Sequence, residues 1–425
     1  MLRRFGRFTR RRLPLSLLLA IASPFILEAL IHVWGYGVAR PTTDLDPPFA
    51  TSCQSPDVDG DSDNGGAARE NAVLVMLARN GERVNAKKTV RSVEKHFNQW
   101  FGYPILFLND EPWDERFVKE LNETAGGRAV FEVVPRSQWT FPDWIDPDLA
   151  RESIREQARD GGAPHAGKEG YHHMCRFYSG QFYQLDALKK FKWYWRIEPD
   201  VEYTCAITYD PFVEMAKRKK VYGYTMALWE VGKSCPSLFR ATVDWKEAAG
   251  LPTTSLWRAM IEPSWAPFPF RRLLSWIPHR DRFGDAWSLC HFWSNFEIAD
   301  LDFFRSRAYR EYFEYLDKAG GFYYERWGDA PIHSLAVAML ADPKQIHHFA
   351  DIGYRHADLY QCPGNAPGGQ LPDSAALAGH KTWSDEVKGG IGCRCTCDGK
   401  KPRNFGGYCL DRLKQPVSPP KGWFS

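Results

Sequence analysis

The chain has 425 residues, of which 44% are hydrophobic and 25% are charged. It is therefore long enough to bury a large core, either as one enlarged domain or as two domains. Its formal net charge is only +3, and six arginines lie among the first twelve residues, so the rest of the chain is slightly acidic. This balance argues against nucleic acid as a partner.

An apolar run follows these arginines. Residues 13–27 read LPLSLLLAIASPFIL, and a more mixed continuation, which contains Glu28 and His32, reaches Val38. The run alone is short for a membrane-spanning helix, which needs about 20 residues, but the continuation supplies the missing length.

We therefore predict a cytosolic basic tail at residues 1–12 and a signal anchor at residues 13–38, because basic flanks stay on the cytosolic side. The rest of the chain is then lumenal. A cleaved signal peptide, with Ala20-Ile21-Ala22 as its cleavage site, is the alternative. The single N-glycosylation sequon, Asn122-Glu123-Thr124, fits a lumenal location, although its occupancy stays open.

Residues 39–70 are rich in Asp, Pro, Gly and Ser and contain few apolar side chains. Such a composition is typical of segments that cannot bury a core. We predict a flexible stem between the membrane and the folded domain.

Four segments then predict the start of a parallel sheet. Residues 71–80 (NAVLVMLARN), 104–110 (PILFLND) and 129–135 (AVFEVVP) are apolar runs of strand length. A helix is predicted after the first run, because apolar residues recur there at spacings of three and four: Val90, Val93, Phe97 and Phe101. This βαβ order favours an α/β fold. Neither G-x-G-x-x-G nor a P-loop follows the first run.

Further elements are predicted along the rest of the chain. We expect helices at residues 171–191, at 306–318 and in the last part of 320–340, strands from Trp193 and at 220–228, and an irregular insertion rich in Pro and Trp at 236–285.

The strand from Trp193 runs directly into two acids, Glu198 and Asp200. Carboxylates at the carboxyl end of a strand emerge where open α/β sheets bind ligands, so a metal site is one interpretation. Pro199 holds its neighbours in an extended conformation. An ordinary strand end with solvated acids is the alternative, and the surrounding sequence must decide.

Ten cysteines suit an oxidising compartment, but their pairing is not readable from the sequence. The cluster CRCTC at residues 393–397 lacks the C-x2-C pairs of a zinc site. We therefore expect disulfides that clamp a C-terminal extension, residues 366–425, onto the domain.

Five ordered motifs carry a family resemblance: MCRFYSGQFY, YWRIEPDVEYTC, HFWSNFEIADLDFFRS, GGFYYERWGDAPIHS and HHFADIGYRH. Together they resemble the fungal α-1,2-mannosyltransferase family from about Asn71 to Pro363. The resemblance implies a type II Golgi membrane protein with one enlarged lumenal catalytic domain, residues 71–365. It also implies a glycosyltransferase-A-like, Rossmann-type mixed sheet flanked by helices. The donor would be GDP-mannose, the cofactor Mn²⁺, the acceptor a mannosylated glycoprotein, and the anomeric configuration would be retained.

The resemblance assigns the metal to Glu198 and His356. An oxygen ligand together with an imidazole suits Mn²⁺, and a divalent ion would neutralise the diphosphate leaving group. His347 and His348 are nearby alternatives to His356. Asp200 would contact the donor or the metal through water, or simply face solvent.

Glu297 is the residue that best fits a role at the reacting sugar. A lone acid between Phe296 and Ile298 is costly when it is buried and unpaired, so it must reach solvent, pair or serve chemistry. A retaining transfer uses a carboxylate either as a nucleophile or to stabilise an oxocarbenium-like state. The alternative is a structural role, in which Glu297 forms an ion pair with Arg305 or Arg326.

Other residues are expected around the substrates. Tyr171 resembles a family tyrosine near the reacting sugar. Without the resemblance, we would assign Tyr171 to core packing. Arg79 and Asn80 follow the first strand, where the guanosine end of the donor would lie, and strand capping is the alternative. Arg176 would serve the diphosphate or pair with Asp186. Three residues of GGFYYERWGDAP would contact sugar, unless the cluster is core: Tyr323, Trp327 and Asp329.

The sequence therefore predicts a retaining α-1,2-mannosyltransferase. Transfer of mannosyl phosphate, or formation of another linkage, is the alternative within enzymes. A secretory mannose-binding lectin is the alternative outside them, but a binding module has no need of Glu198, Glu297 and His356 together.

Overall fold

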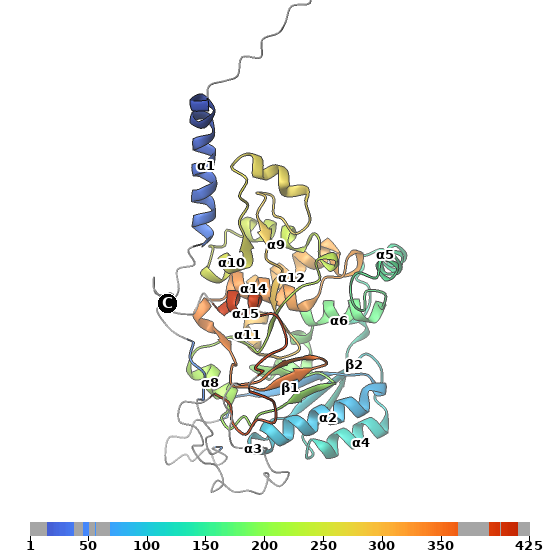
Figure 1. Ribbon diagram of the computed structural model, residues 1–425. Coiled ribbons are helices and arrows are strands. Elements are labelled where there is room, and N and C mark those ends of the chain that lie inside the picture. The colour runs from blue at the N-terminus through green and yellow to red at the C-terminus, as the bar shows by residue number, and fades with distance from the viewer. Residues whose placement is uncertain are drawn as a thin grey trace, which may run out of the picture.

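The computed structural model describes residues 15–37, 46–50, 56, 69–363, 391–399 and 401–414. A long apolar helix, α1 (Leu15–Gly37), projects from one end of an α/β domain that is built around a central sheet (Figure 1). The basic tail predicted at residues 1–12 lies outside the described residues.

The central sheet has seven strands. In spatial order they are β12 (Ile346–His348), β6 (Tyr222–Tyr224), β11 (Glu297–Asp300), β4 (Trp193–Arg196), β1 (Ala72–Leu77), β2 (Ile105–Asn109) and β3 (Ala129–Val133). All neighbours pair in parallel except β11, which is antiparallel to both β4 and β6. The mixed Rossmann-type sheet is confirmed.

Helices cover both faces of this sheet (Figure 1). On one face the even side chains of β1, such as Leu74, pack with α2 (Arg83–Val93) and α4 (Glu115–Thr124). On the other face Val73 and Val75 belong to a core that includes α6 (Glu169–Gly180), α12 (Arg307–Ala319) and α14 (Asp329–Leu340). Every residue of β1 from Ala72 to Met76 is buried, which explains its continuous apolar sequence.

The predicted helices are present; α12 and α14 are continuous, whereas the two earlier helices are interrupted. The first continues from α2 through a π-turn at Glu94–Asn98 into α3 (Gln99–Phe101). The segment predicted at residues 171–191 divides into α6, a 3₁₀ turn and α7 (Asp186–Lys189). The run at 220–228 divides into β6 and β7 (Ala227–Trp229), and β7 pairs with β10 (Cys290–Phe292) rather than with the central sheet.

The prediction of an irregular insertion at 236–285 is wrong in its first half. Two helices form there, α9 (Leu238–Ala248) and α10 (Ser255–Met260), and the face of α9 that carries Phe239 and Val243 is buried, with α12 as its neighbour. Apolar residues recur at spacings of three to four in these helices, but the prolines and tryptophans around them made the pattern hard to recognise. The second half runs through β8 (Ile261–Glu262), the 3₁₀ helix η6 (Phe270–Trp276) and β9 (Ala286–Trp287).

Four further helices belong to the domain. They are α5 (Pro147–Asp160), α8 (Pro211–Lys217), α11 (Leu301–Arg305) and α13 (Gly321–Tyr324).

Disulfides hold the described parts of the C-terminal extension on the domain, as expected for a clamped tail. They join Cys205 to Cys395, Cys362 to Cys397 and Cys290 to Cys409, and the last of these fixes helix α15 (Gly407–Lys414). Two cysteines of the described chain, Cys175 and Cys235, are free and buried.

Part of the predicted stem is folded against the domain, which corrects the expectation of a flexible segment there. The Asp46 carboxylate accepts hydrogen bonds from the Lys220 ammonium, at 2.8 Å, and from the His348 amide, at 3.0 Å. Phe49 is buried and stacks on the His347 ring with 3.6 Å between centroids. A run of small and polar residues gives no hydrophobic pattern, so these few anchors were not recognisable.

The predicted anchor corresponds to α1. By length and composition this helix is able to cross a membrane, and its apolar side chains are almost all exposed, unlike those of a core helix.

Candidate active site

The two residues predicted to hold a metal lie on neighbouring segments at one corner of the domain. Glu198 lies just beyond β4, and a turn through Pro199 and Asp200 leads into β5 (Val201–Tyr203). Strand β5 pairs with β13 (Tyr354–His356), which pairs in turn with β14 (Leu359–Gln361). In this register His356 lies opposite Val201, so the small sheet carries His356 to the turn that follows Glu198.

The Glu198 carboxylate is 21% exposed and is oriented by two neighbours. Its Oε1 atom accepts a hydrogen bond from Arg196 Nε at 2.9 Å, and its Oε2 atom accepts one from Asn295 Nδ2 at 2.8 Å. Both partners come from β4 and the segment before β11, which lie side by side in the sheet.

Arg196 joins Glu198 to a second acid. Its buried guanidinium also donates to Asp329 at the start of α14 and lies 3.6 Å above the centre of the Tyr178 ring. Ser294 Oγ donates to the same Asp329 carboxylate at 2.8 Å. Burial alone would raise the pKa of Asp329, but Arg196 holds that pKa below its ordinary value.

The imidazole of His356 is half-buried and stacks on Trp293 with 5.2 Å between ring centroids. Its Nδ1 atom is buried and has no hydrogen-bond partner among the described residues. A buried polar nitrogen without a partner is costly, so this atom is suited to bind something that the protein itself does not supply.

The alternative histidines lie elsewhere. His347 and His348 also carry unpartnered ring nitrogens, but both are on β12. This strand is three positions from β4 in the sheet, which corresponds to about 14 Å at the usual spacing of about 4.8 Å. Their other ring nitrogens are held by Asp46 and by the Thr225 carbonyl. Neither histidine is therefore placed next to Glu198.

Asp200 occupies the turn itself. Its side chain is exposed and its φ angle is +70°, a left-handed conformation that Asp tolerates better than most residues. It stands free at the edge of the corner, where it is able to meet a ligand or only solvent.

Glu297 is buried completely on β11, and both of its oxygens are engaged. Tyr194 Oη donates to Oε1, and His333 Nδ1 lies 2.9 Å from Oε2. The His333 Nε2 atom contacts the Tyr178 carbonyl, which can only accept, so Nε2 carries a hydrogen. The pair therefore shares one proton between Oε2 and Nδ1.

Burial raises the pKa of Glu297, because a carboxylate loses its hydration inside the protein, while His333 acts in the opposite direction. The predicted alternative partners, Arg305 and Arg326, are wrong: Arg305 donates to backbone carbonyls of Leu188 and Phe191, and Arg326 pairs with Glu230. A sugar would reach Glu297 only if neighbouring side chains moved.

Tyr171 is half-buried near the amino end of α6. Its hydroxyl accepts a hydrogen bond from Arg326 Nη1 at 3.3 Å, and the guanidinium also lies 5.6 Å from the centre of the Tyr171 ring. Because Arg326 is also paired with Glu230, at 3.1 Å, these contacts hold the tyrosine in one place.

The aromatic residues of the GGFYYERWGDAP motif belong to the core. Tyr323 and Trp327 are each 1% exposed. The Tyr323 hydroxyl lies 3.0 Å from His173 Nδ1, and the Trp327 indole donates to Glu325 at 2.6 Å. Asp329 is the member of this set that connects to Glu198, through Arg196.

Arg79 and Asn80 follow β1, which is the strand next to β4 and parallel to it. The Arg79 side chain is 72% exposed, and its one ion pair, to Glu82, spans 3.2 Å. The Asn80 amide donates to the Pro112 carbonyl at 2.9 Å and accepts from the Asp114 amide at 3.0 Å, so it also caps the loop.

Arg176 is not available to a diphosphate. Its guanidinium is buried and forms two hydrogen bonds to Asp317, at 2.7 and 2.8 Å. The predicted alternative partner, Asp186, is wrong as well, because Asp186 is exposed and pairs with Lys189.

Sequence reasoning missed Arg196, Tyr194 and His333. The only signal was a charged residue inside the strand WYWR, since a buried strand rarely carries an arginine without a partner. His333 gave no signal, because its role depends on how α14 packs on β11.

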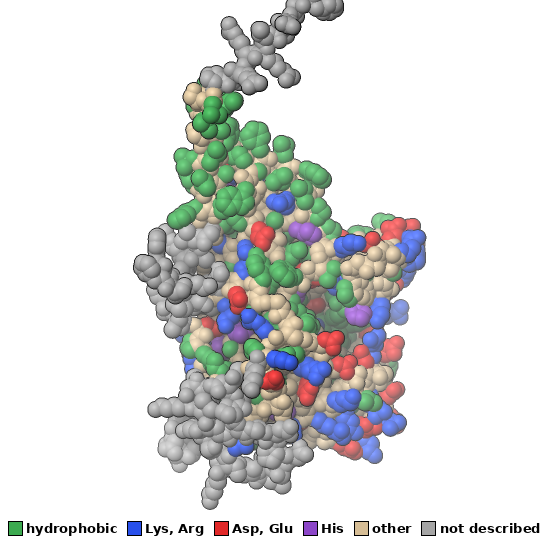
Figure 2. Space-filling model, viewed as in Figure 1, with side chains coloured by type: hydrophobic (Ala, Val, Ile, Leu, Met, Phe, Trp, Pro, Cys, Tyr) green, Lys and Arg blue, Asp and Glu red, His purple; other side chains and the backbone are tan. Residues whose placement is uncertain are grey.

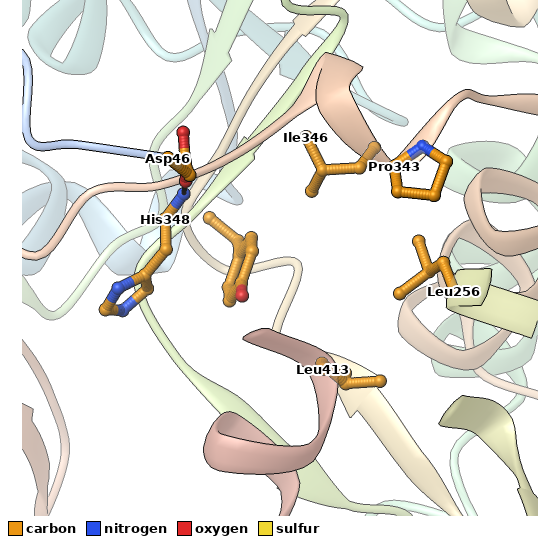
Figure 3. A pocket seen from close by; sticks show the side chains of 7 residues that line it. Asp46, Leu256, Pro343, Ile346, His348 and Leu413 are labelled. Atoms are coloured by element: carbon orange, nitrogen blue, oxygen red, sulfur yellow. Dashed lines mark hydrogen bonds between the residues drawn. The ribbon is translucent and has the colours of Figure 1, made fainter. Parts of the chain in front are cut away.

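Figure 3 shows a small pocket at the β6–β12 edge of the sheet. It has room for about one water molecule and is too small for a nucleotide sugar. It is lined by Asp46, Tyr224, Leu256, Pro343, Ile346, His348 and Leu413, none of which belongs to the Glu198 corner.

Two solved structures share this fold. Core-mannan synthase A (CmsA/Ktr4) from Aspergillus fumigatus, solved in a Mn/GDP form, is 37% identical with a TM-score of 0.65, over 76% of this chain and 83% of that one. The mannosyltransferase Ktr4p from Saccharomyces cerevisiae, in complex with GDP, is 28% identical with a TM-score of 0.67, over 97% and 94%. The fold and the site thus define a glycosyltransferase.

The sequence comparisons narrow this class. The profile of the family described as "Glycolipid 2-alpha-mannosyltransferase" matches residues 46–367. The probable mannosyltransferase KTR7 of Saccharomyces cerevisiae is 37% identical over 432 aligned residues, which cover 89% of this chain and 82% of that protein. The chain belongs to the glycolipid 2-alpha-mannosyltransferase family and is a mannosyltransferase.

Proposed function

We propose that the protein transfers mannose from GDP-mannose to the 2-hydroxyl of an α-mannoside on a glycoprotein glycan, with retention of configuration. The family match and the GDP present in the two solved relatives support this donor. The observation that carries the proposal for this chain is the unpartnered Nδ1 of His356 at the turn after Glu198.

Glu198 and His356 would hold Mn²⁺. The donor set fits, because Glu198 keeps its carboxylate partly exposed and His356 offers a buried nitrogen without a hydrogen bond. When bound, the ion supplies positive charge that stabilises the departing diphosphate. Arg196 and Asn295 hold the Glu198 carboxylate in one orientation, and Trp293 holds the His356 ring, so the site is organised before the ion arrives.

Arg79, Asn80 and Asp200 would bind the nucleotide. Strands β1 and β4 are adjacent and parallel, so the residues after them emerge at the same edge of the sheet, where open α/β folds bind ligands. Arg79 is free to turn toward phosphate or base, since its ion pair with Glu82 is largely exposed and therefore weak. Arg176 is left out of this donor site.

Glu297 and Tyr171 would act at the reacting sugar. Glu297 lies one strand from Glu198 and shares a proton with His333, so it is able to carry negative charge beneath an oxocarbenium-like sugar without facing bulk water. A nucleophilic role and a purely electrostatic role both stay open. Tyr171, held by Arg326, would hydrogen-bond a sugar hydroxyl, and Asp329 would contribute through Arg196.

We further propose that the protein is a single-pass type II membrane protein of the Golgi, with α1 as its anchor. Support comes from the six arginines before α1, which favour a cytosolic amino end, and from its exposed apolar side chains. Mannosylated glycoproteins passing through that lumen would then be the acceptors.

The test uses the full chain in detergent with GDP-mannose, Mn²⁺ and α-methyl mannoside, with EDTA added to a parallel sample. We expect an α-1,2-linked disaccharide, detected by mass spectrometry and digestion with an α-1,2-specific mannosidase, and no product with EDTA. A product that resists this digestion would point to another linkage. A product that contains phosphate would identify a mannosyl-phosphate transferase. Mannoside binding without product would favour the lectin. Transfer that persists in EDTA would overturn the assignment of Glu198 and His356.

A further inference from the structure

One surface of the domain exposes large apolar side chains next to α1. The segment 264–277, which contains η6, connects β8 to β9. Five of its side chains are between 46% and 81% exposed: Trp265, Phe268, Phe270, Leu273 and Trp276. A monomeric protein in water rarely leaves such a group of side chains uncovered, so this surface is expected to have a partner.

The segment 264–277 is in contact with α1. Phe25 and Phe270 lie 5.7 Å apart between ring centroids. Glu28 accepts a hydrogen bond from Arg271 Nη1 at 2.6 Å and another from the Phe268 amide at 2.7 Å. Figure 2 shows that apolar side chains on α1 are followed by many more over the neighbouring part of the domain, while charged side chains are densest at the right and lower right of this view, away from α1.

These contacts lie between the lumenal end of α1 and its middle, at some distance from the end of the helix. Phe25 and Glu28 precede Gly37, the last residue of the helix, by 12 and 9 positions, which corresponds to about 18 and about 14 Å at 1.5 Å per residue. The whole helix is about 35 Å long, and the hydrocarbon core of a bilayer is about 30 Å thick. If α1 crosses the bilayer, the segment 264–277 reaches the level of its lumenal leaflet.

The charges on this surface are arranged as a bilayer requires. Glu28 and His32 interrupt the apolar sequence of α1 with side chains that can carry charge, and both are partnered by the domain, through Arg271 and through Asp285 at 2.8 Å. Arg271 and Arg272 both lie against the exposed ring of Phe268, and the exposed Arg272 is able to extend from there toward the polar headgroups.

We propose that the segment 264–277 is a second membrane-binding element, which lies in the lumenal leaflet beside α1 and attaches the catalytic domain to the lipid surface. The occupant of the apolar surface is the bilayer rather than a second copy of the chain, because the surface is continuous with an exposed helix long enough to span a membrane. This inference rests on α1 as the anchor.

The test uses the full chain with a single environment-sensitive label on an introduced cysteine. The free cysteines of the described chain are buried, and labelling of the unsubstituted chain gives the background. The positions are Trp276→Cys and Trp265→Cys in the segment, Leu19→Cys in α1, and Trp144→Cys as a control. Trp144 is 51% exposed and lies just before α5, a helix that Figure 1 shows away from α1. The proteins are reconstituted in phosphatidylcholine–phosphatidylserine vesicles with or without lipids that carry a spin-label quencher.

We expect the labels at 276, 265 and 19 to lose most of their fluorescence to the quencher lipids, and the label at 144 to keep its signal. Quenching at 19 without quenching at 276 and 265 would overturn the proposal and leave the anchor intact. Absence of quenching at all positions would reject the anchor, and the inference with it. Quenching of label 276 by a second labelled copy, but not by lipid, would assign the surface to a dimer and also overturn the proposal.

Discussion

Replacement of Glu297 by Gln separates a chemical role from a structural one. The amide oxygen of Gln is able to accept the hydrogen bond that Tyr194 now donates, and its NH₂ group is able to donate to His333 Nδ1, because His333 Nε2 already carries the hydrogen directed at the Tyr178 carbonyl. Every buried polar atom of the cluster therefore keeps a partner. We expect Glu297→Gln to cost about 1 kcal/mol of folding stability or less.

The effect on turnover should be much larger. Loss of a carboxylate that only stabilises developing charge should lower kcat by about 10²- to 10³-fold, or about 3–4 kcal/mol of transition-state stabilisation. Loss of a nucleophile should approach about 10⁶-fold. The size of the defect therefore also distinguishes the two retaining mechanisms.

The assay combines radiolabelled mannose transfer, calorimetric binding of GDP and thermal unfolding. Glu202→Gln is the matched control, because Glu202 is an exposed acid on β5 close to the same corner. We expect normal GDP affinity and nearly normal Tm for both variants, with a turnover defect only in Glu297→Gln. Near-normal turnover in that variant would refute the reasoning and make Glu297 a structural partner of His333.

Three further predictions concern the metal site, its ion pairs and a buried histidine elsewhere in the domain. His356→Ala should remove the unpartnered nitrogen and weaken Mn²⁺ binding by at least about 10-fold in calorimetry, whereas His279→Ala should not; equal affinities would exclude His356 as a ligand. Arg196→Met should leave Glu198 and Asp329 without their buried counterion and lower the free energy of unfolding in urea by about 3–5 kcal/mol; a change under about 1 kcal/mol would show that the pairs carry little net stability. Burial lowers the pKa of His96 from 6.5 to about 4, so between these pH values the unfolded chain binds a proton that the folded chain does not. Stability should therefore fall by up to about 3 kcal/mol as pH drops through this window, and His96→Gln should remove that part of the dependence in urea unfolding; an unchanged pH slope would contradict it.

Much of the fold was accessible from the sequence because local pattern and tertiary role agree. The apolar run at β1 is continuous because helices cover both of its faces, and the acids after β4 stand at the sheet edge where ligands bind. The failures have equally local causes. Helix α9 was missed because its apolar spacing lies among prolines and tryptophans, and the packing of Asp46 on β12 was missed because isolated anchors in a polar segment leave no periodic signal.

By itself, the sequence determined the family, the βαβ opening, the apolar amino-terminal helix and the residues around Glu198, Glu297 and His356, since each is encoded in a contiguous motif. Only the tertiary structure decided which of these groups touch. Glu297 shares its proton with His333, which is 36 positions away, and Arg196 reaches Asp329 across 133 positions. Such pairings depend on how β11 and α14 meet β4, and sheet register and helix packing are properties of the whole chain rather than of any motif. For the same reason the contact of α1 with the segment 264–277 was not readable from either segment alone.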